Sequence, residues 1–259
     1  MSVTIIHPTA IVSEKARIGT NVKIGPFSIV DDDVEIGDNT VIRSNVVLSD
    51  GARIGSNCEL FPGAVIATEP QDLKFTGEPT LAIVGDRTVI REYATIHRGT
   101  GESKRTVVGS DCLIMAYSHV AHDCIIGDSV IISNTTQMAG HVEIEDNVNI
   151  GGVVKIHQFC RIGRYAFIGA DVKIVKDVPP YTLIGRQPAK VEGINKIGLR
   201  RKGFSNEKIN EIEKFYDTIL FSSLNNRDGI KKYKEENEIS EEISHCIRFI
   251  EDSKRGIHR

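Results

Sequence analysis

Apolar residues recur with a period of six along most of the chain. Aliphatic residues stand at every sixth position from Val12 to Ile66, again from Val84 to Ile96, and from Val108 to Ile174. The one exception in these runs is Met138. Glycine often follows the apolar residue directly, where a tight corner uses its backbone freedom. Four positions after the apolar residue, small side chains predominate, as at Ala16, Ser28, Cys58, Ala64, Cys112, Ser118, Cys124 and Ala166.

This hexapeptide pattern predicts a parallel β-helix with three short sides, one hexapeptide to a side and 18 residues to a coil. The large apolar residue would fill the interior, and the small residue would lie where the triangular cross-section narrows. Periodicity does not determine the hand of such a coil, because ordinary parallel crossovers are right-handed.

The period fails in two places, which we expect to be loops that protrude from the coil. Asp72 and Glu78 fall on apolar positions within about residues 68–81, and Glu102 does so within about 99–107. Excursions from a solenoid are candidates for function, since the coil itself offers few concave surfaces.

The repeats end near Ile174, and we expect a helical domain after a connecting segment. We divide the chain into a β-helix over 1–191 and a helical domain over 192–259. Ser205 is a candidate N-cap for a helix of this domain. Helical spacing marks the apolar face of a final helix at Ile239, Ile243, Cys246, Ile247 and Ile250.

Composition narrows the class of protein. The chain has 259 residues and a net charge of −3, which gives no overall reason to expect nucleic acid as a partner. We find no apolar run long enough to span a membrane and no secretory leader. The five cysteines include no CxxC pair, which favours reduced thiols and a cytoplasmic location.

Histidines and polar residues gather at one place in the predicted coil. His122, Gly140 and Gln158 are 18 residues apart, so they should form a column along the axis, with coils roughly 4.8 Å apart. His141 and His157 flank it. Imidazole accepts a proton near neutral pH, and a glycine N–H can face a developing oxyanion.

We interpret this column as an acyl-transfer site, with His122 as general base, the Gly140 N–H as oxyanion donor, and His141 and Gln158 positioning substrate. Three alternatives remain at this point. The histidines could be outward-facing scaffold residues, they could bind zinc, or the whole coil could be a non-catalytic trimeric scaffold. We expect no metal.

Several stretches outside the repeat resemble the UDP-N-acetylglucosamine acyltransferase family, and they occur in the same order along nearly the whole chain. They are Gln71-Asp72-Leu73-Lys74, Gly77-Glu78-Pro79, Ile96-His97-Arg98-Gly99-Thr100, Ala121-His122-Asp123-Cys124, Ala139-Gly140-His141-Val142, His157-Gln158-Phe159-Cys160, Asp177-Val178-Pro179-Pro180-Tyr181 and Arg201-Lys202-Gly203-Phe204-Ser205. The resemblance implies a left-handed β-helix.

The resemblance also implies a reaction. An R-3-hydroxyacyl chain would pass from acyl carrier protein to the 3-position of UDP-N-acetylglucosamine, the first step of lipid A biosynthesis. The donor would be carried on the carrier's phosphopantetheine, with no other cofactor. His122 matches the family's base, and the family works as a homotrimer with sites between subunits. The rival is another hexapeptide acyltransferase, either a coenzyme A-dependent acetyltransferase or the N-acyltransferase of the same pathway.

Further residues carry roles by the same resemblance. Arg201 matches a residue that meets the phosphates or the phosphopantetheine, and Ala170 matches a position that helps set acyl length. Two positions depart from the family pattern. Ile197 stands where some members have glutamate, and Lys202 stands where some have arginine, which binds phosphate differently from lysine. The matches to substrate-contacting positions are Gln71, Asp72, Lys74, His119, His141, Gln158 and Asn195.

A basic cluster falls in an otherwise acidic chain. Lys196, Arg200, Arg201 and Lys202 lie within seven residues. Acyl carrier proteins are acidic, so this cluster could steer their approach. The alternative is an ordinary solvated helix face.

Overall fold

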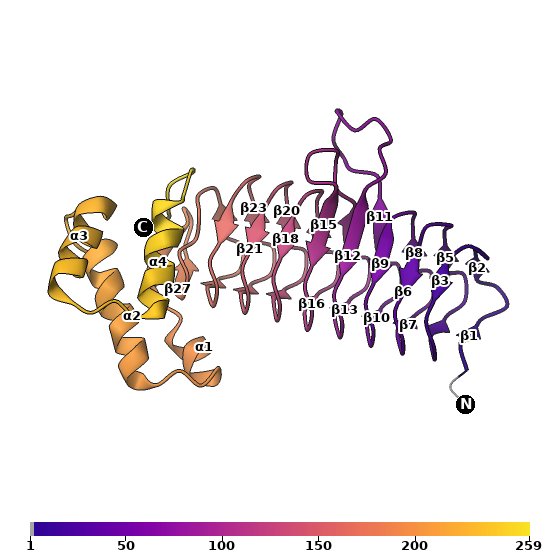
Figure 1. The fold of residues 1–259 in the computed structure, drawn as a ribbon, viewed down its shortest axis with the longest axis horizontal. Coiled ribbons are helices and arrows are strands. Elements are labelled where there is room, and N and C mark those ends of the chain that lie inside the picture. The colour runs from indigo at the N-terminus through magenta and orange to yellow at the C-terminus, as the bar shows by residue number, and fades with distance from the viewer. Residues whose placement is uncertain (1–2) are drawn as a thin grey trace.

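A computed structural model describes residues 3–259 and shows a triangular parallel β-helix that carries helices at its C-terminal end (Figure 1). The chain passes in turn through three sheets, named A, B and C. Within each sheet, consecutive coils pair in parallel, with partners 18 residues apart in the regular coils, as for Ile131 and Asn149. The coil predicted from the period of six is therefore the one observed.

The strands are short, and most contain two residues. Sheet A comprises β1 (Ile5–Ile6), β4 (Lys23–Ile24), β7 (Val41–Ile42), β10 (Glu59–Leu60), β13 (Val89–Ile90), β16 (Leu113–Ile114), β19 (Ile131–Ile132), β22 (Asn149–Ile150), β25 (Phe167–Ile168), β27 (Thr182–Gly185) and β28 (Lys190–Ile194). Sheet B comprises β2 (Ile11–Val12), β5 (Ile29–Val30), β8 (Val47–Leu48), β11 (Val65–Thr68), β14 (Thr95–His97), β17 (His119–Val120), β20 (Gln137–Met138), β23 (Lys155–Ile156) and β26 (Lys173–Ile174). Sheet C comprises β3 (Arg17–Ile18), β6 (Glu35–Ile36), β9 (Ala52–Ile54), β12 (Leu81–Val84), β15 (Arg105–Val108), β18 (Ile125–Ile126), β21 (Glu143–Ile144) and β24 (Arg161–Ile162).

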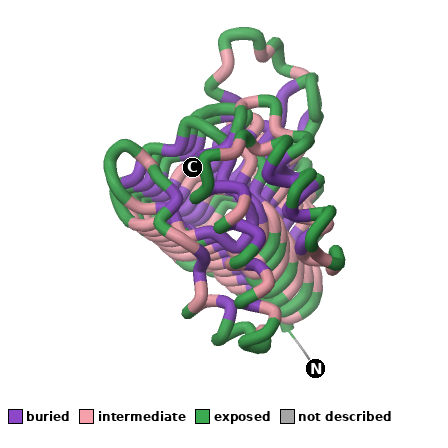
Figure 2. Tube along the Cα trace, turned by 90° about the vertical axis from the view of Figure 1, so that its left-hand side faces the viewer, coloured by how far each residue is buried: buried purple, intermediate pink, exposed green. Residues whose placement is uncertain are grey.

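The period of six follows from this geometry. One residue of each two-residue strand points outward, and the next, the aliphatic one, points into the prism. The interior is a continuous stack of buried apolar side chains, chiefly Ile, Val and Leu. Figure 2 looks along the coil and marks the buried positions of the chain in purple. Cys58, Cys112, Cys124 and Cys160 are buried at the narrow positions, as their spacing predicted.

Two excursions interrupt the coil where the period fails. The first runs from the end of β11 at Thr68 to the start of β12 at Leu81, and the second from the end of β14 at His97 to the start of β15 at Arg105. They project together from one edge of the prism (Figure 1). The Gly101 N–H in the second loop donates to Glu78 Oε1 in the first at 2.7 Å, so the two loops support each other.

The C-terminal helices are α1 (Lys196–Arg201), α2 (Asn206–Ile219), α3 (Asn226–Glu236) and α4 (Glu241–Glu251). Ser205 caps α2, as predicted, by accepting from the Lys208 N–H. The expectation for Ile239 was wrong. The final helix begins after Ser240, whose hydroxyl caps it, and Ile239 lies outside it and is exposed.

The helices are joined to the coil by polar contacts as well as apolar packing. Glu145 accepts from His245 Nε2 and from the Arg164 N–H, each at 2.8 Å. Burial raises the pKa of the Glu145 carboxyl, but these hydrogen bonds outweigh burial and lower it overall. The β27–β28 hairpin adds a last antiparallel pair to sheet A and runs past residue 191, so the division at 191/192 stays a proposal. None of the helices within residues 3–259 is long and apolar enough to cross a membrane.

Candidate active site

Parallel register stacks three polar corner positions between sheets B and C. His119 pairs with Gln137, and Gln137 pairs with Lys155. The corners that follow these strands carry, at their second residue, His122, then Gly140, then Gln158. The column expected from 18-residue spacing therefore exists, next to the two protruding loops.

His122 is held by its neighbour along the chain. Its Nδ1 lies 2.7 Å from Asp123 Oδ2. The corner makes this contact possible because Asp123 adopts a left-handed backbone conformation, with φ of 59°, which turns its side chain back toward the imidazole. A carboxylate at Nδ1 selects the tautomer that carries its proton there and leaves Nε2 as an acceptor.

Asp123 is buried and well supplied with donors. Thr100 donates from its N–H at 2.9 Å and from its hydroxyl at 2.8 Å, and the Ser103 hydroxyl is also in contact with the carboxylate. Burial alone would raise the pKa of Asp123, but the hydrogen bonds from Ser103, His122 and Thr100 outweigh it and lower that pKa. The Asp123 carboxyl is thus a permanent anion beside His122 at neutral pH.

Gly140 packs directly against the His122 ring. A Cβ at position 140 would lie 2.5 Å from His122 Cε1 and 2.8 Å from Nε2, so only glycine leaves room for the imidazole. The Gly140 N–H donates no hydrogen bond to any residue within 3–259. A free N–H therefore lies close to the acceptor nitrogen of the proposed base.

His141 closes the other side of the imidazole. Its ring stands nearly perpendicular to that of His122, with centroids 5.2 Å apart, and it stacks on Phe159 at 4.7 Å. His141 Nε2 lies 3.6 Å from Asp123 Oδ2 and 3.8 Å from Glu102 Oε2. Loop 98–104 thus contributes a carboxylate to the rim of the site.

Two more histidines lie on sheet B beside the column. His119 Nδ1 is 2.7 Å from the Thr95 hydroxyl, and the His97 ring meets His119 edge-on at 4.8 Å. Burial lowers the pKa of both rings, that of His97 to about 4, with the neighbouring imidazoles adding to the shift. Both are neutral at pH 7, so neither adds positive charge beside the column, and His119 also lines a cavity beside it.

Two adjoining cavities, of about 540 and 490 Å³, meet at His122, Gln158 and Gln71. The first lies beneath the loops and adds Asp72, Lys74 and His141, and the second runs over the outer face of sheet B and adds His119 and Gly140. The structure thus brings together all but three of the site residues predicted from sequence.

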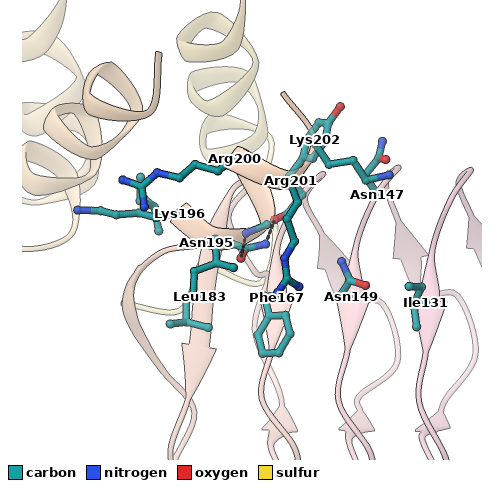
Figure 3. A pocket seen from close by; sticks show the side chains of 14 residues that line it. Ile131, Asn147, Asn149, Phe167, Leu183, Asn195, Lys196, Arg200, Arg201 and Lys202 are labelled. Carbon is teal, nitrogen blue, oxygen red and sulfur yellow. Dashed lines mark hydrogen bonds between the residues drawn. The ribbon is translucent and has the colours of Figure 1, made fainter. Parts of the chain in front are cut away.

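Those three lie elsewhere in the protomer. Asn195 and Arg201 line a third cavity of about 810 Å³ on the outer face of sheet A, where Arg201 extends toward Phe167 (Figure 3). Asn195 is buried and caps α1, accepting from the Gly198 N–H at 3.1 Å and donating to Tyr165 O at 3.0 Å. Ala170 is exposed at the corner between sheets A and B.

The basic cluster of residues 196–202 lies on α1 and the turn that follows it. All four basic residues line the third cavity (Figure 3), and Lys196 also forms an ion pair with Glu213 in α2. The whole cluster therefore lies at the third cavity, with the charge of Lys196 also paired inside the protomer.

One group of donor atoms has a spacing suitable for a metal ion. Atoms of His122, Asp123 and His141 lie within 4.8 Å of one another. The Asp123 oxygens, however, already accept from His122, Thr100 and Ser103. The contacts that would be ligands are thus used as hydrogen bonds, which favours the proton-transfer interpretation.

Comparison with known proteins gives a consistent family. A family model described as UDP-N-acetylglucosamine O-acyltransferase, domain 2, matches residues 177–258, and a bacterial transferase hexapeptide model matches residues 15–50, 33–68 and 105–140. The acyl-[acyl-carrier-protein]--UDP-N-acetylglucosamine O-acyltransferase of Thermodesulfovibrio yellowstonii is 47% identical, with 98% of this chain and 99% of the relative covered. The enzyme of that name from Janthinobacterium sp. is 43% identical, covering 99% and 100%. The chain belongs to this family.

A solved structure extends the similarity to the fold. A UDP-N-acetylglucosamine acyltransferase from Bacteroides fragilis 9343 superposes with a TM-score of 0.97 at 47% identity, covering 98% of this chain and all of the other. The expected left-handed β-helix with a small C-terminal helical domain is confirmed, and so is the resemblance on which its hand rested. This member of the O-acyltransferase family is an acyltransferase.

Sequence reasoning about this acyltransferase missed Asp123 and its partners. The signal for Asp123 was present, since it directly follows His122. Thr100 ends one of the family-like stretches, but nothing in the sequence linked Thr100 or Ser103 to Asp123, because that contact depends on the path of a non-repeating loop.

Proposed function

We propose that this protein transfers an R-3-hydroxyacyl chain from the phosphopantetheine of acyl carrier protein to the 3-hydroxyl of UDP-N-acetylglucosamine, with His122 as general base. The family supports the substrates. The single observation that carries the base assignment is the 2.7 Å contact between His122 Nδ1 and Asp123. It leaves Nε2 as a proton acceptor facing the cavities.

The proposed chemistry needs no enzyme nucleophile. His122 Nε2 takes the proton of the sugar hydroxyl as its oxygen attacks the thioester carbonyl carbon. The tetrahedral intermediate then collapses, the C–S bond breaks, and the imidazolium returns its proton to the phosphopantetheine thiolate. The Asp123 carboxylate stabilises the imidazolium between the two steps, as an acidic partner does in other histidine-based acyl transfer.

The intermediate carries a negative oxygen that needs a donor. The Gly140 N–H has no partner within residues 3–259 and lies beside His122, so it is suited to this role. Lys74 and Asp72 from the first loop, with Gln71, His119, His141 and Gln158, would position the sugar nucleotide. Chain length would be influenced where the acyl group follows sheet B toward the corner that holds Ala170.

Assembly as a homotrimer would explain why the predicted site residues occupy two places. Asn195 and Arg201 line the cavity on sheet A, and His122 lies at the corner of sheets B and C. Sites between subunits would let the sheet A cavity of one protomer complete the His122 site of its neighbour. We also propose a cytoplasmic location, supported by five free cysteines that are all buried.

The test is product analysis. Purified protein is incubated with UDP-N-acetylglucosamine and a panel of 3-hydroxyacyl carrier proteins of different lengths, and products are identified by mass spectrometry. We expect one 3-O-acylated product and a preferred chain length. Parallel reactions contain acetyl-coenzyme A as donor or a sugar with a free amine as acceptor. Product in these reactions alone would contradict the proposal and favour a different hexapeptide acyltransferase.

A further inference from the structure

The catalytic pair is connected to the second protruding loop through three hydrogen bonds. The loop places the N–H and hydroxyl of Thr100 and the hydroxyl of Ser103 against the Asp123 carboxylate. A fourth contact holds the backbone of Asp123 itself, whose N–H donates to the Thr106 hydroxyl at 2.8 Å. No other aspartate in the described coils receives two side-chain hydroxyls from a loop that leaves the coil.

The second loop is itself fixed by the first. Glu78 Oε1 accepts from the Gly101 N–H at 2.7 Å, and Glu78 Oε2 accepts from the Thr76 N–H at 3.0 Å. The first loop also carries Asp72 and Lys74, which line the cavity beside His122. A continuous hydrogen-bonded path therefore runs from a substrate-facing loop to the carboxylate that holds the imidazole.

We propose that Thr100 and Ser103 are positioning residues, whose hydroxyls fix the Asp123 carboxylate and so set the orientation and basicity of His122. This inference rests on the proposed role of His122 as base and adds to it. A carboxylate with fewer donors is free to rotate, and it concentrates more negative charge on the oxygen that faces the imidazole.

The charges around the pair determine the direction of the effect. His122 and Asp123 face His141 from the next corner, Glu102 from the second loop, and Asp72, Lys74 and Glu78 from the first. His97 and His119, on sheet B, are neutral at pH 7 because burial lowers their pKa. Removing a hydroxyl changes none of these charges, so the response should come from Asp123 alone.

The test uses Ser103→Ala and Thr100→Val in the full-length protein, with Thr100→Ser as the variant that keeps the hydroxyl. We expect kcat to fall about tenfold in each loss variant, the typical effect of removing one hydrogen bond to a charged group. The acid limb of the pH profile of kcat/KM should move upward by roughly half a unit, since a less neutralised Asp123 favours protonated His122. KM for the sugar nucleotide should stay within about twofold.

Ser110→Ala is the matched control, because Ser110 also stands at a corner of the coil, and its hydroxyl donates no hydrogen bond within residues 3–259. Thr100→Ser and Ser110→Ala should keep the parent pH profile. Thermal melting by circular dichroism identifies any variant whose activity falls because it unfolds.

A second readout does not depend on turnover. The imidazole nitrogens of His122, observed by NMR in labelled protein, report its tautomer and titration directly. Loss of the Nδ1–H signal pattern, or an upward shift of the titration, is expected in Ser103→Ala. Unchanged titration and an unchanged acid limb in both loss variants would overturn the inference. The wild-type protein could fail to make acylated sugar while Ser103→Ala still shows these NMR changes. That result would contradict the proposed function and leave the positioning role intact.

Discussion

Two corners of the same prism use the same backbone turn for different purposes. At the corner from sheet C to sheet A, four aspartates at the second position after the strand each cap an N–H in the coil below. Asp128 Oδ1 accepts from the Ser110 N–H at 2.7 Å, and Asp146 Oδ1 accepts from the Asp128 N–H at 2.8 Å. Asp38 and Asp86 do the same for Thr20 and Ser56. These aspartates complete the hydrogen bonding of the coil.

At the corner from sheet B to sheet C, the equivalent positions are occupied by His122, Gly140 and Gln158. No carboxylate caps the turn, and neither the His122 nor the Gly140 N–H donates a hydrogen bond within residues 3–259. The aspartate at this corner, Asp123, is one residue later and turns to the imidazole. In these coils, therefore, the corner without a capping carboxylate is the one that holds the candidate base and a free glycine N–H.

The largest loss of kcat should come from removing His122, the side chain that stands at the uncapped corner. His122→Ala should lower kcat by about 10³-fold or more, because it removes the imidazole that the Asp123 carboxylate orients as the proton acceptor. Circular dichroism and size-exclusion behaviour should be unchanged, since the ring lies outside the apolar core. Near-normal turnover in this variant would show that the uncapped corner is not the site of chemistry.

Filling the space beside the imidazole should have the next largest effect. Gly140→Ala would place Cβ 2.5 Å from His122 Cε1, which forces the ring out of position, and we expect kcat to fall on the order of 10²-fold. Gly152→Ala is the control, because its Cβ would meet only Asn134 O, at 3.3 Å. Steady-state kinetics of both variants decide the point, and equal activity would contradict the close packing at position 140.

Restoring the cap tests the comparison most directly. Gln158→Asp places a carboxylate where the other corner has one, so it should accept from the Gly140 N–H and remove the proposed oxyanion donor. We expect kcat to fall on the order of 10²-fold. Gln158→Ala loses the same amide contacts and leaves the N–H free, so its loss should be about tenfold smaller. Equal kinetics for the two variants would mean that the free N–H has no catalytic role.

The sequence predicted the parts of this site that repeat. A period of six gives an 18-residue coil, and the coil brings His122, Gly140 and Gln158 into register without further information. Handedness required the family resemblance, since interior packing is satisfied by apolar residues at the same spacing in either hand. The family resemblance also supplied Asn195 and Arg201, which the structure places on another face.

What the sequence could not predict depends on segments without periodicity. Thr100 and Ser103 reach Asp123 because residues 98–104 fold back over the corner, and their path is set by contacts such as Glu78 with the Gly101 N–H. Helix ends are likewise local, as Ile239 shows: its spacing fits the final helix, but the Ser240 cap begins that helix after it.

The smallest effect on kcat should come from a change at the capped corner between sheets C and A. Asp128→Ala removes the acceptor for the Ser110 N–H, and we expect the free energy of unfolding to fall by about 1 kcal/mol with kcat unchanged. Chemical denaturation measures the first quantity and steady-state kinetics the second. The two variants should be compared with each other. Gln158→Asp is expected to show the reverse of Asp128→Ala, because its added cap should preserve or raise the free energy of unfolding and lower kcat. If Asp128→Ala impaired catalysis without loss of stability, the two corners would be coupled rather than independent, and the absence of a cap could not by itself explain where the reactive site lies.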